Sequence, residues 1–229
     1  MSSIAENIKT IRSNIAAALQ GDDRAVLLVA ATKMNDADRV REAIAAGVDA
    51  CGENKVQEFL EKDGQDAYAG CPKHFIGHLQ RNKVNKIVGQ VDLIQSVDSV
   101  ELLELIQRRA AALGIVQDIL IEISIAGEAQ KSGISPAELP ALLAYAGGCS
   151  ALRVRGLMCV PPVQEFPGQN RPYFDAMRQL FVDNSNKKYD NVIMDFLSMG
   201  MTDDYEEAVA AGANMVRVGS AIFGRRQYF

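Results

Sequence analysis

Residues 26–52 read VLLVAATKMNDADRVREAIAAGVDACG and hold the first instance of the pattern that decides the fold. The stretch opens with an apolar run, Val26–Ala31, whose length suits a buried parallel strand. Asp36–Ala46 then places apolar residues at the three- and four-residue spacing of a helix, and a second apolar run, Val48–Gly52, follows it. A strand, a helix and a strand in this order indicate parallel pairing, because parallel neighbours need a crossover connection.

The same alternation continues to the end of the chain. The predicted strands are Val26–Ala31, Val48–Gly52, His74–Gly77, Leu93–Ser96, Ile119–Ile125, Val154–Val160, Val192–Leu197 and Met215–Val218. The predicted helices include Asp36–Ala46, Val56–Gln65, Val100–Leu113, Pro136–Ala146, Pro172–Asn184 and Asp203–Ala211. Eight such units in 229 residues favour a closed (β/α)8 TIM barrel, although a doubly wound open α/β sheet uses the same units.

A further helix is predicted ahead of the first strand. Between residues 3 and 19, isoleucines and a leucine recur at three- and four-residue spacing, which indicates an amphipathic helix on the outside of the barrel. The only proline-rich stretch, PPVQEFPGQNRP at 161–172, follows the sixth predicted strand and is interpreted as a loop. The sequence therefore predicts a single domain over residues 1–229.

Composition narrows the class of function. The chain is 48% hydrophobic and carries 24 Lys and Arg residues against 29 Asp and Glu, which argues against a general nucleic-acid binder. The N-terminus lacks the features of a secretory signal, and no run of about 18 apolar residues predicts a membrane span. The four cysteines form no CxxC pair, so we expect reduced thiols in a cytoplasmic protein. The only histidines are His74 and His78, and no metal site is predicted.

The predicted barrel directs attention to the residues at which each apolar run stops, because barrel proteins bind ligands at the carboxyl ends of their strands. Lys33 ends the first run, and alternation places it on the same face as Leu27 and Val29. If that face points into the barrel, apolar surroundings disfavour the charged amine and make it a nucleophile for imine formation. The alternative is a lysine on the rim that extends into solvent.

The ends of the seventh and eighth strands supply a second signal. The chain reads LSMGMTDD at 197–204, where Gly200 frees the backbone and Thr202 is expected to cap the helix that follows. It reads RVGSAIFG at 217–224, where Gly219 and Ser220 open another helical turn. Loops at these two strand ends form the recurrent phosphate site of barrel enzymes, so a phosphorylated ligand is expected.

A reactive lysine and an anion site together fit a phosphorylated carbonyl compound. Two classes of ligand remain, a sugar phosphate bound as in Schiff-base aldolases and pyridoxal 5'-phosphate. Arg217 shares a face with Gly219 and could donate a hydrogen bond to a pyridine nitrogen, or could instead form a surface ion pair. An aldolase would need an acid or base near the lysine, for which Glu53 is the only strand-end carboxylate, and this residue could equally serve as a helix cap.

The chain resembles the pyridoxal phosphate homeostasis protein family. The motifs that carry the resemblance are LLVAATK (27–33), ACGENKVQEFLEK (50–62), HFIGHLQRNKV (74–84), LIQSVDS (93–99), GEAQKSGI (127–134), LRVRGLMCVPP (152–162) and LSMGMTDDYEEAVAAGANMVRVGSAIFGRR (197–226). The resemblance implies a barrel similar to the N-terminal domain of alanine racemase and other fold-type III enzymes, with pyridoxal 5'-phosphate as the cofactor. One departure is visible, since Met34, Asn35 and Asp36 follow the lysine where relatives commonly carry Thr or Phe and then a Lys/His-Pro pair.

The resemblance also implies the site residues. Lys33 would carry the cofactor as a Schiff base, and Arg217 would face the pyridine nitrogen. The phosphate ligands that it implies are Ser198, Gly219 and Ser220, and Asn54 corresponds to a residue beside the ring. The other cofactor-binding positions are Met199 and His78, which would line the same pocket, and Gly200 from the strand-end argument. A second lysine of the family that can take up the cofactor corresponds to Lys131.

These expectations favour a carrier over an enzyme. The second base of an alanine racemase comes from a C-terminal β-domain, whereas this chain ends 11 residues after the eighth predicted strand. An arginine at the ring nitrogen also weakens the ring as an electron sink. We therefore expect a monomeric reservoir that passes the cofactor to apo-enzymes without robust catalysis, the alternative being a slow amino-acid racemase or transaminase that uses Lys33 as its sole base.

Overall fold

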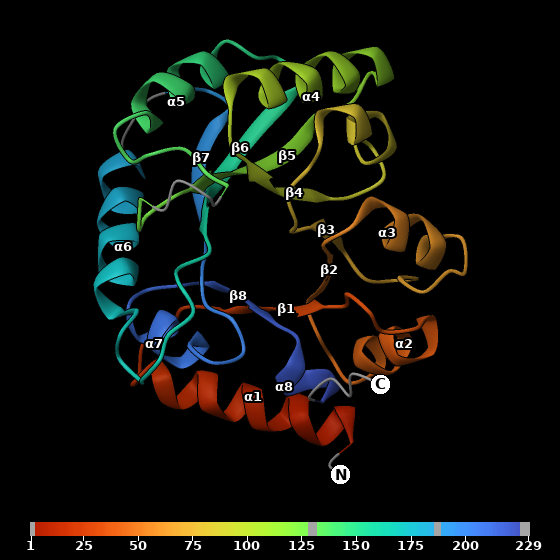
Figure 1. The fold of residues 1–229 in the computed structure, drawn as a ribbon, viewed down its shortest axis with the longest axis vertical. Helices are drawn as coiled ribbons and strands as arrows, with labels where there is room; N and C mark the ends of the chain where they lie inside the picture. Colours follow the sequence, from red (N-terminus) through yellow and green to blue (C-terminus); the bar gives the residue numbers. More distant parts are fainter. Residues whose placement is uncertain (1–2, 128–131, 186–188, 225–229) are drawn as a thin grey trace.

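The computed structural model of the protein describes residues 3–127, 132–185 and 189–224. Its eight strands are all parallel and close into a barrel in chain order, with β8 paired to β1 (Figure 1). The (β/α)8 barrel predicted from the sequence is thereby confirmed, and the open sheet is excluded. The strands are β1 (Leu27–Ala31), β2 (Ala50–Glu53), β3 (Lys73–Phe75), β4 (Leu93–Val97), β5 (Gln117–Ile123), β6 (Leu152–Cys159), β7 (Val192–Ser198) and β8 (Met215–Val218).

Helices surround the barrel on the outside (Figure 1). They are α1 (Ile4–Ala18), α2 (Ala37–Ala45), α3 (Val56–Asp63), α4 (Val100–Leu113), α5 (Leu139–Gly147), α6 (Arg171–Ser185), α7 (Tyr205–Ala210) and α8 (Ser220–Phe223). A 3-10 helix, η1 (Arg81–Lys86), connects β3 to β4. In the part of the chain that the structure describes, no helix is both long enough and apolar enough to cross a membrane.

The third strand is displaced from its predicted position. β3 ends at Phe75, whereas the apolar pattern extends it to Gly77. Gly77 lies against the backbone at the end of the preceding strand, β2, so close that an added Cβ would approach the carbonyl oxygen of Asn54 to 2.1 Å. Only glycine fits at this close approach, and the register of β3 with β2 ends at Phe75.

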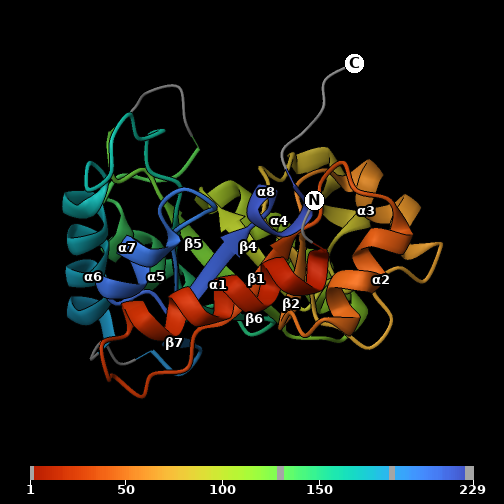
Figure 2. The ribbon, with the colours of Figure 1, turned by 90° about the horizontal axis from the view of Figure 1, so that it is seen from below.

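Helix α1 covers one side of the barrel. Ser3 caps it by accepting from the Glu6 N–H at 3.2 Å, while the Glu6 carboxylate accepts from the Ser3 N–H at 2.8 Å. Its buried isoleucines face inward, and the helix packs against α7, α8 and α2. Figure 2 shows α1 running across the outside of the β8–β1 side of the barrel. This is the position expected for the extra helix.

The barrel interior fixes the direction of the side chains on β1. Val29, with Leu27 packed beside it, belongs to a buried apolar cluster inside the barrel, whereas Leu28 and Ala30 belong to the core between strands and helices. Because side chains alternate along a strand, Ala31 continues the inward-facing series of Leu27 and Val29, and Lys33 lies in the loop just beyond the strand end. The other members of the interior cluster are Ala50, Leu93, Leu120, Met158 and Met215.

Candidate functional site

A cavity of about 1150 Å³ lies at the carboxyl ends of β1 and β8. Four residues predicted as site residues line it, namely Lys33, Arg217, Gly219 and Ser220. The wall also includes parts of α1, α2 and α8 and the loop after β7. The structure thus brings the predicted nucleophile, the predicted ring partner and part of the predicted anion site into one cavity.

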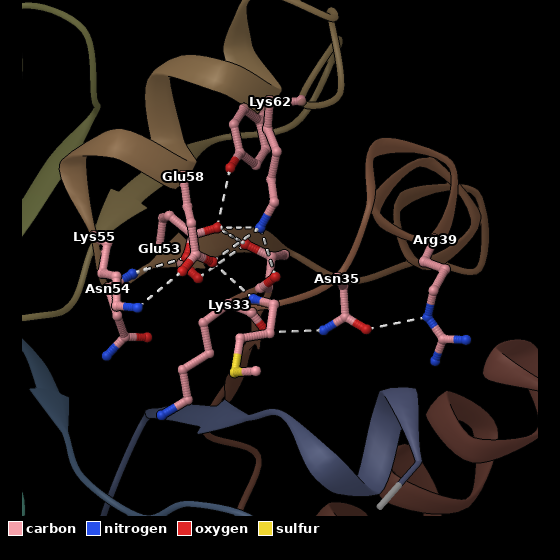
Figure 3. A network of polar contacts seen from close by, with 12 residues as sticks. Lys33, Asn35, Arg39, Glu53, Asn54, Lys55, Glu58 and Lys62 are labelled. Atoms are coloured by element: carbon pink, nitrogen blue, oxygen red, sulfur yellow. Dashed lines mark hydrogen bonds and ion pairs between the residues drawn. The ribbon is translucent and has the colours of Figure 1, made fainter. Parts of the chain in front are cut away.

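Lys33 stands in a short loop between β1 and α2, and it is partly exposed. The side-chain amide of Asn35 donates to the Lys33 carbonyl at 3.1 Å, and Met34 adopts a left-handed conformation with φ of 61°. Asp36 then caps α2 by accepting from the Arg39 N–H at 2.9 Å. The three residues that depart from the family pattern therefore each have a structural role in this loop. Figure 3 shows the Lys33 side chain directed away from the polar contacts around it.

Arg217 is held inside the barrel. Its residue is 4% exposed, its Nη1 donates to Ser198 Oγ at 2.6 Å, and its Nη2 donates to the Cys159 carbonyl at 2.8 Å. Burial lowers the pKa of Arg217, while the nearby Cys159 and Glu122 act in the opposite direction. The two hydrogen bonds fix the plane of the guanidinium group and exclude the surface ion pair considered for this residue.

Ser198 belongs to this interior network and is not among the residues that line the cavity. It is fully buried, and its hydroxyl donates to Gln95 Oε1 at 2.7 Å. Gln95 Nε2 lies 3.0 Å from His74 Nδ1, and burial lowers the pKa of His74 to about 4. His74 is therefore neutral at pH 7, and its Nδ1 accepts from Gln95. A chain of hydrogen bonds connects β3, β4, β7 and β8 across the barrel.

The loops after β7 and β8 meet at Thr202. The Thr202 hydroxyl accepts from the N–H groups of Gly219 and Ala221, each at 3.3 Å. The prediction that Thr202 caps a helix starting at Asp203 is therefore wrong, since α7 begins at Tyr205. The position of Thr202 in the turn after β7 suggested a local helix cap. The partner of its hydroxyl, Gly219, lies 17 residues further along the chain, so local sequence pattern does not predict this contact.

Gly200 has a backbone role. Its φ is 92°, and an added Cβ would lie 2.6 Å from the Cβ of Ala208. Its carbonyl accepts from the Arg217 N–H at 3.0 Å, which connects the end of β7 to β8. Only glycine satisfies both the backbone conformation and the space here.

Three other predicted site residues lie away from the cavity wall. Met199 is buried in the core between strands and helices. The side chain of His78 is 57% exposed, with Nδ1 3.3 Å from Asp98 Oδ2. Asn54 has a buried Oδ1 that finds no hydrogen-bond partner in the described parts of the chain. Lys131 lies outside the described residues.

Glu122 was not predicted from the sequence. It lies on β5 beside Met158 of β6 and is 7% exposed. Burial, with a smaller contribution from Asp98, raises the pKa of Glu122 to about 7, and Arg217 opposes this rise. Among the described residues, Glu122 Oε2 has no hydrogen-bond partner. An acidic residue within the apolar run ILIEI at 119–123 was the available signal.

Known proteins resemble this chain over most or all of its length. The pattern of the alanine racemase N-terminal domain family matches residues 1–227. A pyridoxal phosphate homeostasis protein from Aquifex aeolicus is 42% identical, with 88% of this chain and 87% of the relative covered. One from Pseudomonas aeruginosa is 40% identical over 100% of this chain and 98% of its own length. The solved structure of PipY from Synechococcus elongatus with PLP bound superposes with a TM-score of 0.84 at 32% identity, covering 97% of this chain and 100% of PipY.

Proposed function

Because the chain belongs to the alanine racemase N-terminal domain family, and within it to the pyridoxal phosphate homeostasis proteins, we propose that it binds pyridoxal 5'-phosphate reversibly and releases it to apo-enzymes. The observation that carries this proposal is the shared cavity of Lys33, Arg217, Gly219 and Ser220. An amine, a guanidinium and a glycine-containing strand end together suit a ligand with an aldehyde, a pyridine ring and a phosphate.

The donor set of the cavity fits the cofactor. Lys33 supplies a primary amine from the loop after β1, and the Ser220 hydroxyl at the start of α8 supplies a hydrogen-bond donor for a phosphate. When bound, the cofactor supplies an aldehyde carbon with which a lysine amine condenses.

Arg217 sets the electronic character of the bound ring. A guanidinium group only donates hydrogen bonds, so a pyridine nitrogen facing it accepts and stays unprotonated. An unprotonated ring withdraws electrons weakly, which disfavours carbanion chemistry at a bound amino acid. Arg217 therefore supports a role in holding the cofactor rather than in rapid turnover.

The rest of the cavity gives little support to catalysis. Among the described residues that line it, none is Tyr, His or Cys, and its carboxylates are Asp36, which already caps α2, Glu42 and Asp203. A slow racemase or transaminase would use Lys33 as its base. The aldolase alternative is disfavoured by Glu53, whose carboxylate is 1% exposed and accepts from Lys62, Thr32 and Tyr68 instead of facing a substrate.

A cofactor titration followed by a transfer assay tests the proposal. Wild-type protein should develop a visible absorption band on addition of pyridoxal 5'-phosphate, and Lys33→Ala should not. The loaded protein should then restore activity to a separate apo-enzyme, and should exchange α-protons of amino acids with deuterated solvent no faster than free cofactor does. Absence of the band in wild-type protein would contradict binding, and rapid α-proton exchange would favour the enzyme.

A further inference from the structure

A lysine on α3 extends through the core to the backbone of the loop between β1 and α2, which carries Lys33. Lys62 is 6% exposed, and its Nζ donates to the Thr32 carbonyl at 2.8 Å. The same Nζ donates to Glu53 Oε2 at 2.6 Å (Figure 3). Thr32 directly precedes Lys33, so a buried ammonium group is bound to the peptide unit that joins these two residues.

The Glu53 carboxylate completes this arrangement. Its Oε2 accepts from Lys62, from the Thr32 hydroxyl at 2.9 Å and from the Tyr68 hydroxyl at 3.3 Å, and its Oε1 accepts from the Asn54 N–H at 3.0 Å. Burial and the Glu53 charge raise the pKa of Tyr68, which keeps that hydroxyl protonated as a donor. Glu53 therefore accepts a hydrogen bond in each of these contacts, as an ionised carboxylate must.

Another carboxylate, that of Glu58 on α3, binds the backbone directly after Lys33. Glu58 Oε2 accepts from the Met34 N–H at 2.8 Å and lies 3.8 Å from Lys62 Nζ. Met34 has φ of 61°, a conformation that few residues other than glycine adopt without an external constraint. The bond from Glu58 supplies such a constraint at the residue that directly follows Lys33.

A purely stabilising role explains these contacts poorly. A buried ion pair adds little net stability, because removing two charges from water costs about as much as their attraction returns. Two charged side chains of one helix nevertheless bind the peptide groups immediately before and after a single lysine. Fixing the backbone there removes conformational freedom that imine formation would otherwise have to restrict.

We propose that Glu53, Glu58 and Lys62 form a clamp that positions Lys33 for reaction with the aldehyde of pyridoxal 5'-phosphate. They are positioning residues, since none of their side chains lines the cavity. Lys62 and Glu58 bind the Thr32 carbonyl and the Met34 N–H, and Glu53 holds Lys62 Nζ and the Thr32 hydroxyl in place. Figure 3 shows the clamp on one side of the loop and the Lys33 side chain directed to the other. This inference rests on the proposed function, because it assigns a purpose to Lys33.

Variants of Glu58 test the clamp. Glu58 lies partly exposed on α3, so Glu58→Ala removes the acceptor of the Met34 N–H with little disturbance of the core. Glu58→Gln keeps an acceptor oxygen and removes the charge. Glu61→Ala, at an exposed position of the same helix, is the matched control. Each variant is titrated with pyridoxal 5'-phosphate, and the dissociation constant, the pH midpoint of the absorption band and the thermal unfolding midpoint are measured.

Glu58→Ala should weaken cofactor binding about three- to tenfold and move the pH midpoint of the band, since one hydrogen bond to a charged acceptor is lost. Glu58→Gln and Glu61→Ala should stay within about twofold of wild type, and the unfolding midpoints should differ by no more than a few degrees. Equal affinity and an equal band for Glu58→Ala and Glu61→Ala would overturn the clamp. So would a Glu58→Gln variant as impaired as Glu58→Ala.

A second variant keeps the inference testable if Glu58→Ala does not fold. Glu53→Gln with Lys62→Met replaces the buried pair by neutral side chains of similar size and removes the bond to the Thr32 carbonyl. Weaker cofactor binding by this folded double variant supports the clamp, and wild-type affinity contradicts it. Failure of wild-type protein to bind the cofactor would instead refute the proposed function, so the two failures are distinguishable.

Discussion

Arg217 Nη1 donates to Ser198 Oγ over 2.6 Å, within the barrel and beneath the cavity. Because the Ser198 hydroxyl donates onward to Gln95, it is already committed to two partners inside the barrel. The resemblance to the family implies that Ser198 binds the cofactor phosphate. The structure supports a different role, in which Ser198 orients the guanidinium group of Arg217, which we propose faces the ring.

Substitution of Ser198 distinguishes these two roles. Ser198→Ala leaves Arg217 and Gln95 each short of one buried hydrogen bond, and should lower the free energy of unfolding by about 1–3 kcal/mol. If Ser198 acts through Arg217, the variant should weaken binding of pyridoxal 5'-phosphate and of unphosphorylated pyridoxal by a similar factor. Absorbance titration with both compounds measures this.

The same titration gives a different result if Ser198 binds the phosphate. A phosphate ligand would contribute only to the phosphorylated compound, so loss of affinity for pyridoxal 5'-phosphate with unchanged affinity for pyridoxal would return Ser198 to the phosphate site. Ser220→Ala serves as the comparison, because Ser220 lines the cavity and should affect the phosphorylated compound alone.

Stability should depend on pH through Glu122. The pKa of its carboxyl is raised from 4.5 to about 7 in the folded protein, so ionisation is easier in the unfolded chain and destabilises the fold. The penalty is absent below pH 4.5, grows as the pH rises, and is complete above about 7, where Glu122→Gln should be more stable than wild type by up to about 3 kcal/mol. Urea unfolding at pH 5 and pH 8 measures the difference, and an advantage that does not grow with pH would contradict this origin.

Gly200 should be irreplaceable for a steric reason. Gly200→Ala places a Cβ 2.6 Å from Ala208 Cβ, in addition to its left-handed backbone. Gly47→Ala is the matched control, because Gly47 has φ of 93° and open space around the added carbon. Backbone strain alone should cost about 1 kcal/mol at Gly47, and overpacking should add about 1–3 kcal/mol at Gly200. Equal unfolding free energies for the two variants would show that the contact with Ala208 relaxes freely.

The sequence was sufficient to predict the barrel and one wall of the cavity. Strict alternation of apolar runs and helical segments predicted the eight strands, and the rule that ligands bind at strand ends selected Lys33 and Gly219. Both inferences depend on local pattern, which a single sequence contains. Family membership, first suggested by the motifs, is confirmed by the comparisons.

The side-chain contacts in the interior could not be predicted from the sequence. Lys62 binds the Thr32 carbonyl across 30 residues, and Arg217 binds Ser198 across 19, so neither pair follows from spacing along one element. The buried position of Glu122 could not be predicted, because the direction of its side chain is known only once the face of β5 that points into the barrel is known. Alternation gives two faces of a strand, and tertiary packing decides which one is inside.

The site of imine formation tests the central claim most directly. Protein loaded with pyridoxal 5'-phosphate is reduced with borohydride and digested, and the peptides are identified by mass spectrometry. The account predicts that the cofactor is attached at Lys33, and that Lys33→Ala loses this attachment together with the absorption band. Attachment at another lysine, Lys131 included, with Lys33 unmodified in wild-type protein would contradict it.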